Sequence, residues 1–147
     1  MPAPKLDNQL CFALYTASSH LTAIYRPLLD PLNLTYTQFI VLMALWEDDN
    51  VSISCLAKKA GLSKATMTPL LKRLEQKELI QRQMLDGNER QKNISLTDAG
   101  RALSVQGEKV AQKAFCASGL TKAQAKEMIS LCNTLTRRKF SIEDCDD

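Results

Sequence analysis

Cys11 is the side chain with the clearest chemical potential, because it stands near the start of the amphipathic segment LDNQLCFALYTASSHLTAIYRPLL. With Asp7 or Asn8 as the cap of a helix, Cys11 lies at the end of the first turn, where the partial positive charge of the helix favours a thiolate. At about 100° per residue, five side chains fall within about 40° of one line: Cys11, Tyr15, Ser18, Thr22 and Tyr25. A polar stripe of this kind usually only borders a core, and an isolated cysteine in it behaves as a small hydrophobe. The alternative is a thiol that the helix N-terminus makes reactive.

The other cysteines and the histidine form no disulfide or metal pattern. Five cysteines are an odd number without a CxxC pair, so most should be reduced thiols. His20 is the only histidine and has no companion ligand, so we expect no metal and no cofactor. Cys55 and Cys132 lie on amphipathic faces and are expected to be packed, whereas Cys145 belongs to an acidic tail over residues 141–147.

Length and charge limit the class of protein. A chain of 147 residues suffices for one compact domain, and a net charge of +3 does not by itself argue for nucleic acid. The basic residues are nevertheless concentrated in one segment: Lys58, Lys59, Lys64, Lys72, Arg73, Lys77, Arg82, Arg90 and Lys92. The N-terminus lacks a signal-peptide core, and no run approaches the roughly 18 apolar residues of a membrane span. We therefore expect a cytoplasmic protein without a membrane partner.

Helices should dominate the first part of the chain. Apolar residues recur at steps of four and three from Leu10 to Leu28, which predicts a helix from residue 7 or 8 to about 29 with a narrow buried seam. The sequence TYTQ at Thr35 is a capping-box pattern ahead of FIVLMALW, so a second, strongly buried helix should run to about Asp48.

The middle of the chain predicts a winged helix-turn-helix. Two short helices should join at Gly61, and LIQRQML and QKNISLT around the polar turn DGNER predict a two-stranded hairpin. Thr97 can then cap a helix from 98 to about Cys116, and TKAQ at Thr121 precedes a last helix that ends near Phe140. The expected fold class is mainly α with a small β-hairpin wing.

The second helix of the pair, about residues 63–77, should enter the DNA major groove while the hairpin tip reaches the minor groove or backbone. Leu70, Leu71 and Leu74 can face the core. The residues left towards the bases are Ser63, Lys64, Thr66, Thr68 and Pro69, with Lys72 and Arg73 near phosphates. The alternative is a solvated helix pair with scattered lysines, but the hairpin that follows favours DNA binding.

Two segments, MTPLLKRLEQKELIQR and NERQKNISLTDAG, resemble the MarR family of winged-helix regulators. The family wing carries Asp-x-Arg, five residues, then Leu-Thr; Arg90, Leu96 and Thr97 match, while Asn88 replaces the aspartate. An amide can still accept a hydrogen bond from the wing arginine. The resemblance implies an obligate homodimer, a MarR-type dimer, with dimerisation helices over about 6–31 and 98–140 around a DNA-binding part over about 35–97.

Within this family, LDNQLCFALYTAS and YRPLLDPLNLTYTQF are similar to the organic-hydroperoxide-sensing repressors. The resemblance gives Cys11 the position of the peroxide sensor and Tyr15, Tyr25 and Tyr36 the positions of the tyrosines that hold it. Cys116 matches the second cysteine of the two-cysteine form. The implied protein is a repressor of a pseudo-palindromic operator in double-stranded DNA that an organic hydroperoxide releases by oxidising Cys11, with resolution by Cys116 of the other subunit.

Helix geometry adds a constraint to this expectation. Cys11 and Tyr25 lie roughly 21 Å apart along one helix, so they can meet only across a dimer. An apolar lining around Cys11 would favour an organic peroxide over H₂O₂: Leu10, Phe12, Leu14 and Phe39. Two alternatives stay open, a MarR-type regulator that answers to a phenolic ligand and a thiol peroxidase. The helix-turn-helix and wing argue against an enzyme.

Overall fold

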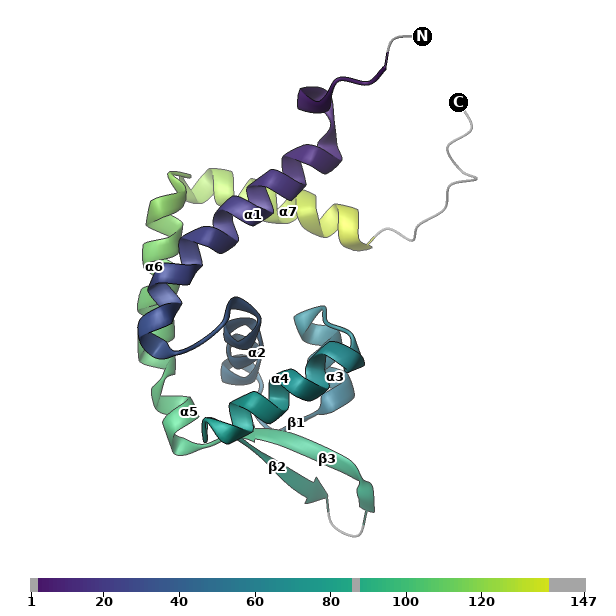
Figure 1. Cartoon of the computed structure of the whole chain (residues 1–147), viewed down its shortest axis with the longest axis vertical. Helices are drawn as coiled ribbons and strands as arrows, with labels where there is room; N and C mark the ends of the chain where they lie inside the picture. Colours follow the sequence, from purple (N-terminus) through teal and green to yellow (C-terminus); the bar gives the residue numbers. More distant parts are fainter. Residues whose placement is uncertain (1–2, 86–87, 138–147) are drawn as a thin grey trace.

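A computed structural model describes residues 3–85 and 88–137 of the chain, with the side chains between 84 and 92 left out. Figure 1 shows a winged body below and two long helices, α1 and α7, that extend above it. The elements are η1 Leu6–Asn8, α1 Leu10–Leu29, η2 Asp30–Leu32, α2 Tyr36–Glu47, β1 Val51–Ser52, α3 Ile53–Ala60, α4 Lys64–Gln76, β2 Ile80–Leu85, β3 Asn88–Leu96, α5 Asp98–Ala102, α6 Ser104–Ser118 and α7 Lys122–Arg137.

The core lies between α2, α3, α4 and the sheet. Helix α2 is apolar on nearly all sides and buries most of its length, as FIVLMALW predicts. Its capping box is present, since the Gln38 amide N–H donates to Thr35 Oγ1 over 3.2 Å and Thr35 N–H donates to Gln38 Oε1 over 3.1 Å. The largest fully buried side chains include Phe39, Leu42, Leu45, Leu56, Met67, Leu71, Leu74, Ile80 and Ile94.

The helix-turn-helix forms where the sequence predicts it. Gly61 ends α3 in the left-handed conformation, with φ of 69°, which glycine adopts without steric cost. Ser63 then caps α4, because its Oγ accepts the Thr66 N–H over 3.2 Å. The turn at Gly61 and the cap at Ser63 thus set where α4, the predicted DNA-recognition helix, begins after α3.

The wing differs from the predicted hairpin in two respects. The sheet has three antiparallel strands in the order β1-β3-β2, because Val51 pairs with Ile94 and Ser52 with Asn93. A strand of two residues carries no alternation that a sequence pattern could reveal. Strand β3 also begins at Asn88, inside the predicted polar turn.

The single helix expected from 98 to about 116 is divided into α5 and α6 at Leu103. Thr97 does cap α5, with its Oγ1 accepting the Gly100 N–H over 3.1 Å. Gly100 also accepts a 2.9 Å hydrogen bond from Trp46 Nε1, and a Cβ on Gly100 would lie 2.1 Å from the Leu79 carbonyl oxygen. The chain therefore passes very close to the winged body before α6 rises away from it (Figure 1).

Helix α1 starts later than predicted and is far less buried. Gln9 occupies its N-cap position without a side-chain hydrogen bond, and Asp7 and Asn8 belong to the separate turn η1, so the predicted caps are wrong. Cys11 becomes the second residue of the helix. The predicted seam is not buried within the chain, since Leu10 is 67% and Leu21 is 41% exposed.

Helix α7 likewise packs little against the rest of the chain. It has no buried residue among those described, and it exposes Met128, Ile129, Leu131 and Leu135. Thr121 caps it as predicted, with Oγ1 accepting the Gln124 N–H over 3.1 Å. Within residues 3–85 and 88–137 no single helix could cross a membrane; only α1 with η2 and α2, bent by 77°, matches such a span in length and composition.

Candidate functional site

Two tyrosines meet at the corner between α1 and α2. The rings of Tyr25 and Tyr36 lie 5.2 Å apart at 53°, and the Tyr25 ring lies 5.8 Å from that of Phe39. The corner is fixed by η2, by Asn33 in the left-handed conformation and by the capping box that starts α2. The structure thus brings together two of the three predicted sensor-pocket tyrosines, although they come from different helices.

The environment of Tyr25 keeps its phenol protonated. Burial and, second, the neighbouring Tyr36 raise the pKa of Tyr25 above its ordinary value of 10.0. A protonated phenol can donate a hydrogen bond to an anion such as a thiolate.

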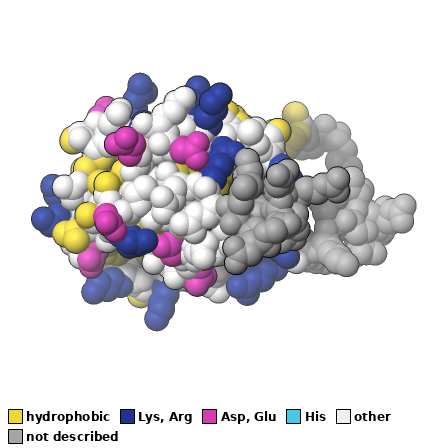
Figure 2. All heavy atoms as spheres, turned by 90° about the horizontal axis from the view of Figure 1, so that it is seen from below, with side chains coloured by type: hydrophobic (Ala, Val, Ile, Leu, Met, Phe, Trp, Pro, Cys, Tyr) yellow, Lys and Arg dark blue, Asp and Glu magenta, His cyan; other side chains and the backbone are white. Residues whose placement is uncertain are grey.

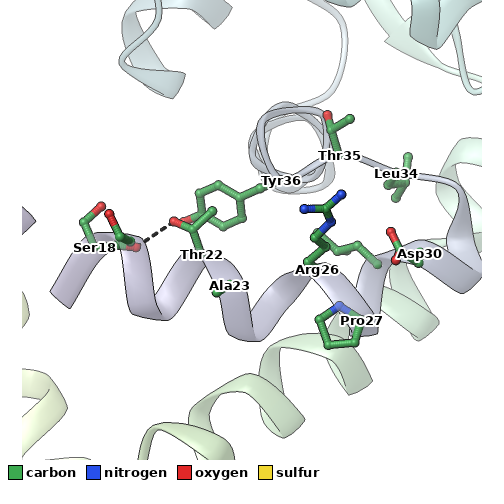
Figure 3. A pocket seen from close by; sticks show the side chains of 11 residues that line it. Ser18, Thr22, Ala23, Arg26, Pro27, Asp30, Leu34, Thr35 and Tyr36 are labelled. Atoms are coloured by element: carbon green, nitrogen blue, oxygen red, sulfur yellow. Dashed lines mark hydrogen bonds between the residues drawn. The ribbon is translucent and has the colours of Figure 1, made fainter. Parts of the chain in front are cut away.

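A pocket of about 770 Å³ opens beside Tyr36, between α1 and the start of α2 (Figure 3). Ser18 and Thr22 of the predicted stripe line it, and Thr22 Oγ1 donates to the Ser18 carbonyl over 2.7 Å. Arg26 reaches from α1 towards Thr35 in Figure 3. The pocket is open to solvent and offers hydroxyl and apolar surface next to a phenol.

Cys11 lies away from this corner within the chain. It is exposed near the start of α1, and Tyr15, one turn further, is 71% exposed. Phe39 is fully buried beside Tyr25 and does not line Cys11 within the chain, so its expected place in that lining stays a prediction. Within a single chain, the Cys11 thiol and the Tyr25–Tyr36 pair therefore lie apart.

The remaining cysteines are also free. Cys116 is exposed in the last turn of α6. Cys55 on α3 is exposed, so the expectation that it is packed is wrong. Cys132 on α7 is also exposed in the single chain, as is the rest of that helix, so its packing stays a prediction. Cys145 lies outside the described residues.

The recognition helix presents the predicted face. All seven predicted contact residues on it are exposed, namely Ser63, Lys64, Thr66, Thr68, Pro69, Lys72 and Arg73. Leu70, Leu71 and Leu74 are buried as predicted, together with Met67, which the sequence reasoning did not place in the core. Ser63 Oγ and Thr66 Oγ1 lie 2.9 Å apart, so both hydroxyls are held in place at the start of α4.

The start of α2 adds residues that sequence reasoning missed. A pocket of about 280 Å³ lies between α2 and α4 beside Arg73. Thr37, whose Oγ1 lies 3.4 Å from Thr35 Oγ1, lines it together with Thr66. This groove carries threonine hydroxyls and an arginine, groups that can contact a DNA phosphate.

Seven of the nine concentrated basic residues have described side chains, and three of these seven make contacts inside the chain. Lys59 pairs with Asp48 over 2.8 Å, Arg82 Nε lies 3.6 Å from a Glu75 oxygen, and Lys77 donates to Gln38. Figure 2 views the molecule from below and shows basic side chains at separate points with acidic ones between them. On the face expected to bind DNA, the described basic side chains are therefore those of α3 and α4. The side chains of Arg90 and Lys92 are not among the described residues.

Comparison with known proteins identifies the family. A sequence model of the MarR family matches residues 34–92. The organic hydroperoxide resistance transcriptional regulator of Bacillus subtilis is 40% identical over 131 residues, which are 89% of this chain and 87% of that protein. The chain belongs to the MarR family.

Two further relatives match over nearly their whole length. The transcriptional regulator SarZ of Staphylococcus aureus is 33% identical over 139 residues, covering 95% of this chain and 94% of SarZ. The structure of reduced AbfR bound to DNA is 32% identical with a TM-score of 0.73, and the match covers 90% of this chain and 91% of that one. Disulfide-formed AbfR, which covers 90% and 88%, has a TM-score of 0.62.

These MarR relatives settle the class of activity. They are transcriptional regulators, so the chain is a DNA-binding transcriptional regulator and not an enzyme, which removes the thiol peroxidase alternative. The winged helix-turn-helix predicted from the sequence is the MarR fold, and a MarR protein bound to DNA is among its structural neighbours.

Proposed function

We propose that this MarR protein is a homodimeric cytoplasmic repressor that releases its operator when an organic hydroperoxide oxidises Cys11. The observation that carries the proposal is a site divided between the two ends of α1. An exposed thiol stands at one end, and the Tyr25–Tyr36 pair with an open pocket stands at the other. A two-fold axis across α1 joins the thiol of one subunit to the phenols of its partner.

The surfaces of α1 and α7 support the dimer. Both helices expose apolar side chains that a single chain leaves in water, including Leu10, Leu21, Ile129 and Leu131. Covering such side chains is favourable by about 25 cal/mol per Å² of apolar area. A second copy of the chain that packs through residues 6–31 and 98–140 covers both faces at once.

The proposed chemistry has two balanced steps. The Cys11 thiolate attacks the peroxide, the O–O bond breaks, the sulfur becomes a sulfenic acid and the alkoxide leaves as an alcohol after taking up a proton. The Cys116 thiol of the other subunit then attacks the sulfenic sulfur, which forms a disulfide and releases water. Tyr15, Tyr25 and Tyr36 border the sensor, and the disulfide shifts the helices of the interface.

In the same proposal, each α4 reads one half-site of a pseudo-palindromic operator. Ser63, Lys64, Thr66, Thr68 and Pro69 face bases, Lys72 and Arg73 lie near phosphates, and Arg90 acts from the wing. The half-sites of such dimers lie about one helical turn apart, or a multiple of it, so a small rotation of either reading head breaks the register.

The decisive experiment measures operator binding with and without peroxide. An operator is first selected by the reduced protein from random duplexes, and its affinity is then measured after treatment with cumene hydroperoxide, with H₂O₂ or with salicylate. The proposal expects release by the organic hydroperoxide at lower concentration than by H₂O₂. Release by salicylate alone would contradict it and would favour a regulator that answers to a phenolic ligand.

The paired tyrosines give a first prediction. Tyr25→Phe or Tyr36→Phe should slow Cys11 oxidation about tenfold or more, because a hydrogen bond to a charged sulfur is worth on the order of 1.5–3 kcal/mol. The rate is followed by thiol labelling, with the operator affinity of the reduced variant as the control for folding. An unchanged rate, or a dimer structure with both hydroxyls more than one water from the partner's Cys11, would refute this role.

The wing gives a second prediction. Arg90→Ala should weaken specific and non-specific DNA binding together and flatten the salt dependence by about one unit of slope, because a phosphate or minor-groove arginine reads charge and groove width. Lys5→Ala, at an exposed position outside the dimer segments and the DNA-binding part, is the matched loss of charge and should change neither quantity. A loss confined to one base pair of the operator would move Arg90 to direct readout.

A further inference from the structure

Lys77 is a cation of the reading segment that turns inward. It follows the last residue of α4, and its side chain is half-buried. Its Nζ donates to Gln38 Oε1 over 2.9 Å and also to the carbonyl oxygen of Asn33. Both acceptors belong to the corner between α1 and α2, so Lys77 joins the end of the recognition helix to that corner.

The acceptor Gln38 is itself part of the structure that holds Tyr36. Its side chain is only 3% exposed, and the same Oε1 atom accepts the Thr35 N–H over 3.1 Å in the capping box of α2. Tyr36 is the first residue of that helix. The side-chain oxygen of Gln38 therefore joins the first turn of α2, which carries Tyr36, to Lys77 at the end of α4.

The turn after α4 also contacts the wing. Glu78 adopts the left-handed conformation, with φ of 60°, and its carbonyl accepts a 2.7 Å hydrogen bond from Thr97 Oγ1 at the base of the wing. The Leu79 carbonyl accepts the Thr97 N–H over 3.0 Å. Lys77 thus connects the corner between α1 and α2, which holds Tyr25 and Tyr36 and is called the tyrosine corner, to the point where the recognition helix α4 and the wing meet.

Keeping an ammonium here has a cost. Burial and, second, the nearby Arg73 guanidinium lower the pKa of Lys77. An exposed lysine on the DNA side would avoid that desolvation, and an apolar residue would avoid it as well. The ammonium is nevertheless directed to two acceptors in the corner, so this position suits a connector rather than a phosphate contact.

We infer that Lys77 is a positioning residue that transmits movement of the tyrosine corner to the recognition helix. The inference rests on the proposed function, in which oxidation of Cys11 displaces the corner. Because Nζ holds both Asn33 and Gln38, the end of α4 must follow a shift of the first turn of α2. Without the connection, α4 stays in its DNA-binding position after the sensor is oxidised.

The test compares operator affinity in the reduced and fully oxidised dimers, with oxidation of Cys11 measured by mass spectrometry. Lys77→Met should lower the ratio of the two affinities about tenfold, within the usual range of coupling between sites, and should leave the salt slope of operator binding unchanged. Gln38→Glu keeps an acceptor for both Thr35 and Lys77 and should preserve the ratio. Lys5→Met, a matched loss of charge at an exposed position outside the dimer segments and the DNA-binding part, should also preserve it.

Several outcomes would overturn the inference. A wild-type ratio in Lys77→Met, or a salt slope lowered by about one with the ratio retained, would make Lys77 an ordinary tether or a phosphate contact. If Lys77→Met does not fold, Lys77→Gln, whose shorter neutral side chain cannot hold both acceptors, is measured in the same way. If wild-type protein keeps its operator with Cys11 oxidised, the proposed function fails and Lys77 has no signal to transmit.

Discussion

Cys11→Ser should bind the selected operator with the affinity of the wild type and should keep it in an excess of cumene hydroperoxide that releases the wild type. The physical reason is that serine preserves the size and polarity of the side chain but cannot be oxidised to a sulfenic acid. Since α1 begins at Leu10, the substitution falls on an exposed helical position and should not alter the fold. The peroxide response should fall by at least about a hundredfold, the upper part of the range of coupling between sites.

The matched controls for this variant are the two other exposed thiols that the proposal leaves without a role. Cys55→Ser on α3 and Cys132→Ser on α7 should release DNA as the wild type does. The measurement is fluorescence anisotropy of labelled operator over a peroxide titration, with mass spectrometry of each thiol. Release of DNA from Cys11→Ser by peroxide would remove Cys11 from the sensor.

Local sequence signals predicted the reading part of the fold. Gly61 and Ser63 mark the turn and the cap of the recognition helix because each acts on its own backbone neighbourhood. The capping boxes at Thr35 and Thr121 are confirmed for the same reason. Each of these caps joins residues three positions apart, so the local sequence is enough to predict it.

Interactions between distant segments were not predictable in this way. The hydrogen bond from Lys77 to Gln38 joins residues 39 positions apart, and no pattern in the sequence relates them. The division between α5 and α6 follows from the close approach of Gly100 to the winged body, whereas helical periodicity continues across it.

The seam on α1 failed for a different reason. Its spacing predicts a buried face, but within the chain Leu10 and Leu21 stay exposed. The chain likewise leaves Cys11 apart from the tyrosines that it is expected to meet. A sequence pattern indicates an apolar face and does not reveal what covers it.

Cys116→Ser should abolish the covalent dimer that wild-type protein forms on oxidation. In the wild type, a disulfide between Cys11 and Cys116 of different subunits should give a dimer on a non-reducing denaturing gel that dithiothreitol converts to monomer. Both sulfurs are free and exposed in the structure. A disulfide requires Cα atoms within roughly 7 Å, so closing it must move the helices that carry the two cysteines.

Without the Cys116 thiol, the sulfenic acid at Cys11 has no protein partner. Cys116→Ser should therefore run as a monomer on the same gel, accumulate sulfenic acid that dimedone labels, and proceed to sulfinic acid more readily than the wild type. Cys132→Ser is the matched control, because it removes another exposed thiol from the C-terminal helices and should still form the covalent dimer. A covalent dimer from Cys116→Ser, or an intrachain bond alone in the wild type, would assign the resolving step to an external thiol or to another cysteine.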